Sequence, residues 1–131
     1  MARENVEIVR AAYEALNRED WDAAFRVADP DFEVTFQRGP FQGTYRGREK
    51  LQAILNDQRQ AFDAWIMEPI ELLESGDQIV AIVISRLRPK DTEAEIELRN
   101  GHLWTVREGT LISLVGFPDP DDALRSAGIR R

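Results

Sequence analysis

Cysteine is absent from this chain of 131 residues, and histidine occurs only once, as His102. Without thiols the chain can form no disulfide, thiolate nucleophile or thiolate metal site. One histidine without a spaced partner gives no recognisable metal-ligand set, although a purely carboxylate metal site stays open. The sequence also lacks a glycine-rich phosphate loop and a serine-nucleophile elbow. We therefore expect neither a metal nor a cofactor.

Long apolar runs are also missing. No stretch approaches the ~20 apolar residues of a membrane-spanning helix, and the first residues, 1–5, lead directly into a charged amphipathic pattern without a signal-peptide apolar stretch. The net charge of −7, from 24 acidic and 17 basic residues, opposes binding to nucleic acid or to an anionic membrane surface. We expect a cytoplasmic protein that binds neither, with its acidity serving solubility.

The length and composition are those of one globular domain over residues 1–131. Apolar residues make up 43% of the chain and charged residues 31%, which is ordinary for a protein that buries a core. A second domain would be too small to be stable by itself. We find no internal repeat, linker or low-complexity segment.

The spacing of apolar residues changes from helical to strand-like along the chain. It predicts helices over residues 4–17, after Asp20 and over 48–63, and a last short helix after Asp119. Alternation predicts strands over residues 32–36, 66–74, 78–88, 95–107 and 110–118. Helices followed by long antiparallel strands indicate an α+β fold. We expect a strongly curved antiparallel sheet that wraps around the N-terminal helices as a cone, with an apolar pocket whose mouth opens to solvent.

Two polar features interrupt this pattern. Gln58 is the one polar residue on the apolar face of the helix over 48–63. The glycine-rich loop over 38–47, which contains Pro40, allows little structural prediction, and whether it closes over the pocket stays open. The side chains in or beside this loop that could contact a ligand are Gln37, Arg38, Gln42 and Tyr45.

His102 is the natural proton carrier at neutral pH, because an unperturbed imidazole has a pKa near 6.5. A two-residue hairpin at Glu108 and Gly109 would place His102 opposite Val115. The face shared with His102 would then carry Trp104, Val106, Val115 and Phe117. We keep two interpretations: a general base or hydrogen-bond donor in the pocket, or a hydrogen-bonded histidine of the core or of an interface.

Tyr13 and Arg86 are further candidates. Tyr13 lies in the apolar stripe of the first helix, so its hydroxyl needs a partner and could either donate to an oxyanion or complete core packing. Arg86 ends a mainly apolar strand and could reach the mouth of the cone. There it could bind a ligand carboxylate, or form an ion pair with Glu95 or Glu97 on the next strand.

Aromatic residues include three tryptophans and six phenylalanines. Most should pack in the core, and some should line a pocket, since ligand sites are mainly apolar. Besides Arg86, the predicted substrate-binding residues are Phe36, Trp65, Trp104 and Phe117.

Several motifs stand at the joints between the predicted elements. They are Ala11-Ala12-Tyr13-Glu14-Ala15-Leu16, Asp31-Phe32-Glu33-Val34, Tyr45-Arg46-Gly47, Glu74-Ser75-Gly76-Asp77, His102-Leu103-Trp104-Thr105-Val106-Arg107-Glu108-Gly109 and Asp121-Asp122-Ala123-Leu124-Arg125-Ser126-Ala127-Gly128. With these motifs the chain resembles the SnoaL-like polyketide cyclase branch of the nuclear-transport-factor-2-like superfamily, which includes ketosteroid isomerase-like proteins and has a cystatin-like cone fold. The resemblance implies a homodimer formed through the sheet.

The resemblance also implies roles for two residues. In the cyclases and isomerases, a tyrosine of the first helix helps to hold an oxyanion, and a strand histidine with an acidic partner moves protons on an apolar substrate. Tyr13 and His102 match the tyrosine and the histidine. The expected acid is missing, since the strand over 110–117 contains no acidic residue.

Two hypotheses of function follow. The first is a pocket for a small apolar molecule with isomerase- or cyclase-type proton transfer, in which Tyr13 steadies an oxyanion and His102 acts as acid or base. The alternative is a non-catalytic ligand-binding or dimerisation module, which the missing strand acid favours. The sequence leaves open whether the protein is catalytic and which substrate it would take.

Overall fold

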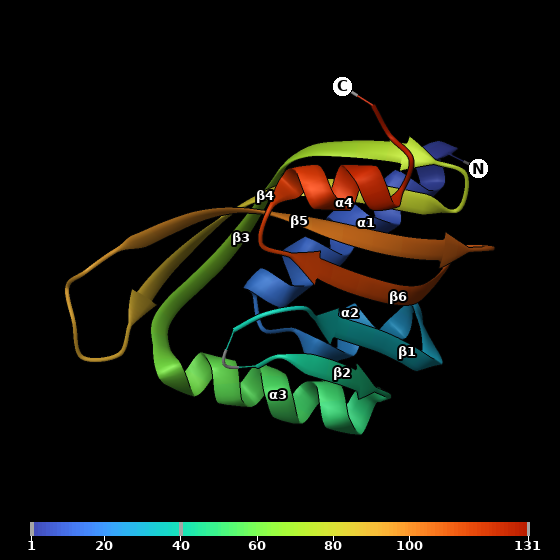
Figure 1. Ribbon diagram of the computed structural model, residues 1–131. Helices are drawn as coiled ribbons and strands as arrows, with labels where there is room; N and C mark the ends of the chain where they lie inside the picture. The colour runs from blue at the N-terminus through green and yellow to red at the C-terminus, as the bar shows by residue number, and fades with distance from the viewer. Residues whose placement is uncertain (1, 40, 131) are drawn as a thin grey trace.

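A computed structural model describes residues 2–39 and 41–130, so Pro40 of the predicted loop lies outside the described residues. Two helices and two strands come first and a third helix follows, and the second half of the chain is mainly strands (Figure 1). The helices are α1 (Ala2–Asn17), α2 (Trp21–Arg26), α3 (Arg48–Ala61) and α4 (Pro120–Ser126). The strands are β1 (Ala28–Phe36), β2 (Gly43–Arg46), β3 (Phe62–Ser75), β4 (Gln78–Pro89), β5 (Ile96–Arg107) and β6 (Thr110–Phe117).

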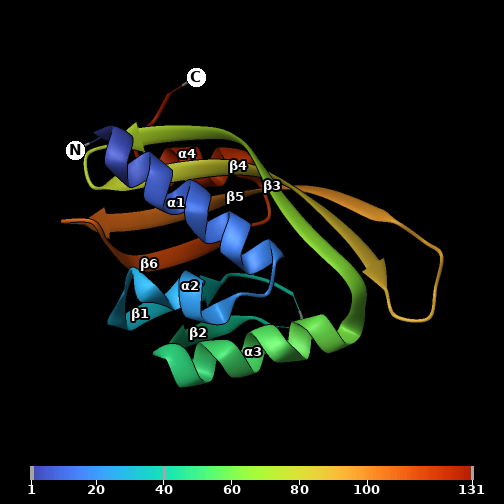
Figure 2. The ribbon, with the colours of Figure 1, turned by 180° about the vertical axis from the view of Figure 1, so that it is seen from behind.

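The strands form one curved, unclosed sheet with the order β2-β1-β6-β5-β4-β3. Neighbouring strands are antiparallel except β1 and β6, which are parallel. Helix α1 covers one face of the sheet and α4 the other, and α3 spans the open side between β2 and β3 (Figures 1 and 2). The predicted α+β fold is therefore confirmed, with one parallel pair added.

The short helices begin where the sequence predicts. The Asp20 carboxylate accepts a hydrogen bond from the Ala23 N–H at 3.2 Å, which caps α2. The Asp119 carboxylate accepts one from the Asp121 N–H at 2.9 Å, and Pro120 occupies the first turn of α4.

Alternation along β4 and β5 divides the apolar residues between two clusters. The inner cluster lies between the sheet, α1 and α3, and its buried members include Val9, Tyr13, Phe32, Leu51, Ile79 and Trp104. The outer cluster lies under α4 and includes Val80, Ile82, Leu103, Phe117 and Leu124. Both faces of these central strands are thus covered.

The region before α3 has more structure than its sequence predicts. Residues 43–46 form the edge strand β2, antiparallel to β1. The Tyr45 hydroxyl donates to the Phe41 carbonyl at 2.9 Å, which folds the preceding loop back on the strand. Strand β1 also begins earlier than predicted, at Ala28, and its pairing with β6 is irregular between Ala28 and Glu33. Pro30 lies in this irregular stretch, where it has no N–H to donate to a ladder.

The predicted register of β5 and β6 is correct beside the hairpin, where Arg107 pairs with Thr110, and wrong by one residue from Thr105 to His102. Thr105 pairs with Ser113 but Val106 pairs with Leu111, so β6 contains one extra residue at a bulge. His102 therefore lies opposite Gly116 rather than Val115. As a result, Val115 and Phe117 belong to the outer cluster, whereas Leu114 packs with the inner cluster.

Candidate functional site

A cavity of about 430 Å³ lies between the concave face of the sheet, α1 and α3. Its wall is mostly apolar and comes from almost every element. Aliphatic and aromatic side chains of the wall include Leu16, Phe25, Phe32, Phe36, Leu51, Leu55, Phe62, Met67, Leu87 and Leu114. This volume and lining are typical of a site for a small organic molecule.

The deep part of the cavity holds three polar side chains that bond to one another. The Tyr13 hydroxyl oxygen lies 2.6 Å from Nδ1 of His102, and the Trp104 indole Nε1–H donates to the same oxygen at 2.9 Å. Tyr13 comes from α1, while His102 and Trp104 are two apart on β5 and so share a face. The structure therefore brings together Tyr13 and His102, the two candidates from the sequence.

The hydrogen-bond pattern favours one tautomer of the imidazole. An indole N–H can only donate, so the Tyr13 oxygen accepts from Trp104. The Tyr13 proton then needs an acceptor, and Nδ1 of His102 is its partner among the described residues. We assign this proton arrangement from the bonding pattern. His102 is therefore the Nε2–H tautomer.

His102 lines the cavity, and Nε2 is the ring nitrogen that the contact with Tyr13 leaves available. No residue within 2–39 and 41–130 bonds to Nε2. A fully covered polar atom without a partner occurs at Trp65 and not at His102, so Nε2 retains accessible surface. Because His102 lines the cavity and is only 8% exposed overall, this surface is the cavity wall. The imidazole thus presents one N–H donor to whatever occupies the cavity.

Burial keeps this cluster neutral at pH 7. Desolvation lowers the pKa of His102 to about 4, because the charged imidazolium loses hydration in an apolar surrounding. Desolvation likewise raises the pKa of the Tyr13 phenol, although the bond from Trp104 opposes this shift. His102 is consequently a neutral hydrogen-bond donor. The Tyr13 hydroxyl is occupied by two protein groups and acts through the position of the imidazole.

Further polar groups line the cavity away from this cluster. Gln58 is 5% exposed, and its amide has no partner among the described residues. The Ser85 hydroxyl donates to Oδ1 of Asn100 at 3.3 Å, which leaves the Asn100 NH₂ group available. Gln58 stands out in the sequence as an interruption of an apolar stripe. Ser85 and Asn100 do not stand out there, because the direction of their side chains depends on the register of β4 and β5.

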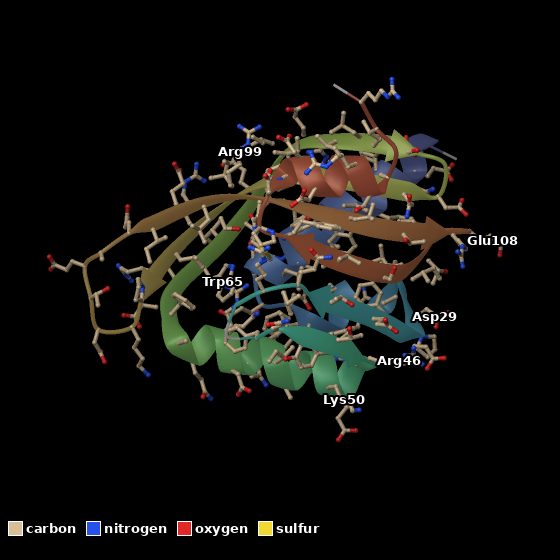
Figure 3. All side chains as sticks on the ribbon, viewed as in Figure 1. Asp29, Arg46, Lys50, Trp65, Arg99 and Glu108 are labelled. Atoms are coloured by element: carbon tan, nitrogen blue, oxygen red, sulfur yellow. The ribbon has the colours of Figure 1, made fainter. Side chains whose placement is uncertain are left out.

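Arg59 and Trp65 lie together where α3 meets β3. The Arg59 guanidinium stacks over the Trp65 ring with 5.7 Å between Cζ and the ring centroid, and it donates to the Trp65 carbonyl at 2.5 Å and the Leu16 carbonyl at 3.1 Å. Phe62 packs edge-on against the indole. The Trp65 Nε1–H is fully covered and has no partner within the described part of the chain. Figure 3 shows Trp65 on the inner side of β3.

The structure places the other predicted binding residues as follows. Phe36, Trp65 and Trp104 contribute to the cavity wall. Phe117 also borders the cavity, at the end of β6, although it packs in the outer cluster. Arg86 does not line the cavity. It lies on the exposed opposite side of the sheet, where it forms ion pairs with Glu68 at 2.7 Å and Glu97 at 3.3 Å. The ion-pair alternative with Glu97 is therefore confirmed.

The loop before β2 contributes to the mouth of the cavity. Gln37, Arg38 and Phe41 are among the lining residues. Tyr45 instead bonds back to the Phe41 carbonyl, as described above. Phe41 is not among the residues predicted from the sequence to contact a ligand.

Acidic residues are absent from the described cavity wall, and its charged residues are arginines. The described ranges also contain no group of three or more histidine, aspartate or glutamate residues that could hold a metal ion. Nor do they contain a helix both long and apolar enough to cross a membrane.

A curved sheet wrapped around a helix, with an apolar cavity on its concave side, defines the class of cone-shaped α+β proteins. The family model for the SnoaL-like domain matches residues 9–114, and the chain belongs to this family. A search of curated protein sequences finds no match.

Solved structures share this fold over nearly the whole chain. An NTF2-like protein of unknown function from Burkholderia pseudomallei is 24% identical, with a TM-score of 0.81 over 93% of this chain and 95% of its own. TerC, crystallised with polyporic acid, is 20% identical, with a TM-score of 0.82 over 95% and 98%. A protein with a ketosteroid isomerase-like fold from Catenulispora acidiphila, in complex with trimethylamine, is 15% identical, with a TM-score of 0.77 over 95% and 94%. At these identities the similarity concerns the fold.

Proposed function

We propose that this protein binds a small, mainly apolar molecule in the cavity and holds an oxygen atom of that molecule on the Nε2–H of His102. The observation that carries the proposal is this one N–H donor, neutral and buried, without a protein partner and facing an apolar space. A carbonyl oxygen is the ligand group that fits best, because it accepts a hydrogen bond and its carbon skeleton is apolar.

The surroundings of His102 support this assignment. A buried donor without a partner costs about 1–3 kcal/mol, so a ligand oxygen that accepts from Nε2–H contributes to binding. The bond from Tyr13 fixes the ring, and Trp104 in turn fixes Tyr13. The donor is thus held in place before the ligand binds, which lowers the entropy lost on binding.

Isomerase- or cyclase-type catalysis is the second candidate function. A rigid N–H donor on a carbonyl oxygen stabilises the negative charge that develops when a neighbouring C–H is deprotonated. His102 supplies this donor, so it acts as the oxyanion partner. The described wall holds no carboxylate that could serve as the base, so water or a basic group of the substrate would have to take the proton. The missing base favours the non-catalytic ligand-binding alternative.

Two of the structural neighbours are compatible with a small-molecule site. TerC was crystallised with polyporic acid, and the Catenulispora protein was crystallised with trimethylamine. By analogy of fold alone, a small organic ligand fits the present cavity as well.

The binding proposal is tested with a pair of probes of similar shape, 2-acetylnaphthalene and 2-ethylnaphthalene, by isothermal titration calorimetry at pH 7.5. His102→Leu should weaken binding of the ketone about tenfold, because only the ketone accepts a hydrogen bond. The hydrocarbon should bind both proteins alike. His102→Gln, which retains an N–H donor, should recover part of the loss. Equal losses for both probes would contradict the role of His102, and no binding of either probe to the wild-type protein would contradict the ligand site.

Catalysis is tested by the exchange of the methyl protons of 2-acetylnaphthalene in deuterated buffer, followed by nuclear magnetic resonance. If the cavity stabilises the enolate, wild-type protein should accelerate the exchange over buffer alone, and His102→Leu should not. Binding of the ketone without accelerated exchange would support the non-catalytic module for this class of substrate.

A further inference from the structure

The charge of the cavity wall is opposite in sign to the charge of the whole protein. The chain has 24 acidic residues and a net charge of −7, yet the described wall includes no aspartate or glutamate and three arginines, Arg38, Arg59 and Arg99. Arg99 contributes through its backbone, since Figure 3 shows its side chain extending away from α3. Arg38 lies at the exposed mouth. Arg59 is therefore the half-buried cation of the cavity.

Arg59 forms no ion pair with another described residue, although the charge of Glu19 acts on it. Its two hydrogen bonds go to the carbonyl oxygens of Trp65 and Leu16, and it takes part in none of the observed ion pairs. Partial burial lowers the pKa of the guanidinium, and the charge of Glu19 opposes this shift. A guanidinium has five N–H donors, so donors remain for a ligand after these two bonds.

Gln58 precedes Arg59 on α3 and adds a second unpartnered polar group. The apolar stripe Leu51, Ile54, Leu55 and Phe62 lines the cavity, and Gln58 occupies the one polar position in it. Its side chain is more than nine-tenths buried and lines the cavity, and no described residue bonds to its amide. A buried amide is costly unless it is hydrogen-bonded. An apolar residue would serve the packing better, so Gln58 is explained by a polar group on the ligand.

We propose that the ligand of this cavity is an apolar carboxylic acid whose carboxylate binds between the Arg59 guanidinium and the Gln58 amide. This inference rests on the proposed function and deepens it, because it adds a second, anionic end to a molecule held at its other end by His102. The apolar body packs between these ends against aromatic residues such as Phe32 and Phe36. Charge-assisted hydrogen bonds in a desolvated site discriminate strongly between an acid and its neutral analogue.

The experiment compares 6-acetyl-2-naphthoate with 2-acetylnaphthalene by isothermal titration calorimetry at pH 7.5. The two probes differ only by the carboxylate. Wild-type protein should bind the acid roughly ten- to hundredfold more tightly. Arg59→Gln should abolish this preference, while affinity for the neutral ketone changes less than about twofold. Gln58→Leu, which continues the apolar stripe, should reduce the preference severalfold.

Two controls separate binding from folding and from general charge effects. Arg10→Gln removes one positive charge from an exposed position of α1 and should keep the full preference. Binding of the neutral ketone reports whether the cavity of Arg59→Gln is intact, since Arg59 also joins α1 to β3. Arg59→Lys keeps the charge but loses the planar fork, and it should retain part of the preference.

The outcomes distinguish this inference from the proposed function. Equal affinity of wild-type protein for the two probes would overturn the anionic end and leave the His102 site standing. A preference that persists in Arg59→Gln would overturn the assignment to Arg59. If neither probe binds to the wild-type protein, the proposed function itself fails.

Discussion

The His102 imidazole is held on one side by a phenol and is open to an apolar cavity on the other. Its two nitrogens therefore have different tasks: Nδ1 accepts the proton of Tyr13, and Nε2–H remains for a ligand. Desolvation keeps the ring neutral at physiological pH. A residue whose unperturbed pKa suits acid–base chemistry thus becomes a hydrogen-bond donor through its surroundings.

The depressed pKa of His102 predicts a loss of stability in mild acid. In the unfolded chain the imidazole has a pKa near 6.5, and in the folded protein its pKa is about 4. Between these values the unfolded state binds more protons, so the free energy of unfolding falls as the pH falls. The full stabilising contribution of the neutral imidazole is present above pH 6.5. From pH 7.5 to pH 5 the loss should be about 2 kcal/mol.

Urea unfolding at the two pH values measures this loss. His102 is the only histidine, so His102→Gln should remove most of the pH dependence in this range. A wild-type stability that is the same at pH 5 and pH 7.5 would show that the imidazole is not desolvated.

At the scale of elements, α4 packs on β5 across Gly101. A Cβ at this position would lie 2.8 Å from the Ala123 Cβ and 2.9 Å from the Pro120 Cα. Contacts this short leave no room for a side chain, so the glycine sets the distance between α4 and the sheet. The same packing buries Leu103 and Phe117 in the outer cluster.

Gly101→Ala should therefore displace α4 and lower the free energy of unfolding by about 1–3 kcal/mol, measured by urea denaturation. Gly116→Ala is the matched control, because a Cβ there would meet its nearest atom, Cδ1 of Phe36, at an ordinary 3.7 Å. The control should change stability by less than about 1 kcal/mol. Similar losses in both variants would mean that β5 and β6 tolerate alanine poorly in general and that α4 is not the cause.

The bulge between Thr105 and Val106 is the other decisive feature at this scale. It moves β6 by one residue against β5 and brings Gly116 opposite His102. A one-residue shift in register changes which side chains face the cavity. This explains why Val115, predicted beside His102, packs on the other side of the sheet with α4.

For the whole molecule, the distribution of charge separates the surface from the cavity. Acidic residues outnumber basic residues in the chain, whereas the charged residues of the described cavity wall are all arginines. A negative surface keeps the protein soluble, and a positive group inside an apolar cavity selects an anion. The two requirements are met by different residues and do not conflict.

The homodimer through the sheet stays a prediction from the family resemblance. Strand β3 is an edge strand, but Pro69 and the irregular pairing between Pro69 and Glu71 interrupt its ladder, and such features protect an edge from further strand pairing. We therefore expect a dimer to use a sheet face. The measurement is the mass in solution by light scattering, for which a chain of 15.0 kDa should give about twice this value, and a monomeric mass would contradict the prediction.

The sequence by itself determined the fold class, the helix starts and most of the strands. These depend on local information: apolar spacing, the caps at Asp20 and Asp119, and the turns at Gly76 and Gly109. It also singled out Tyr13 and His102, because a polar group on an apolar face is visible in the pattern. Strand β2 was missed, since a short edge strand in a glycine-rich segment gives little periodicity.

Only the tertiary structure decided what these residues can do. The bond between Tyr13 and His102 joins residues 89 positions apart, and no local pattern specifies such a pair. Arg86 and Arg59 show the same dependence: the predicted arginine lies in an exposed ion pair, and the unpredicted one reaches the cavity. The bulge in β6 and the desolvation of His102 both arise from long-range packing, and together they set the chemistry of the site.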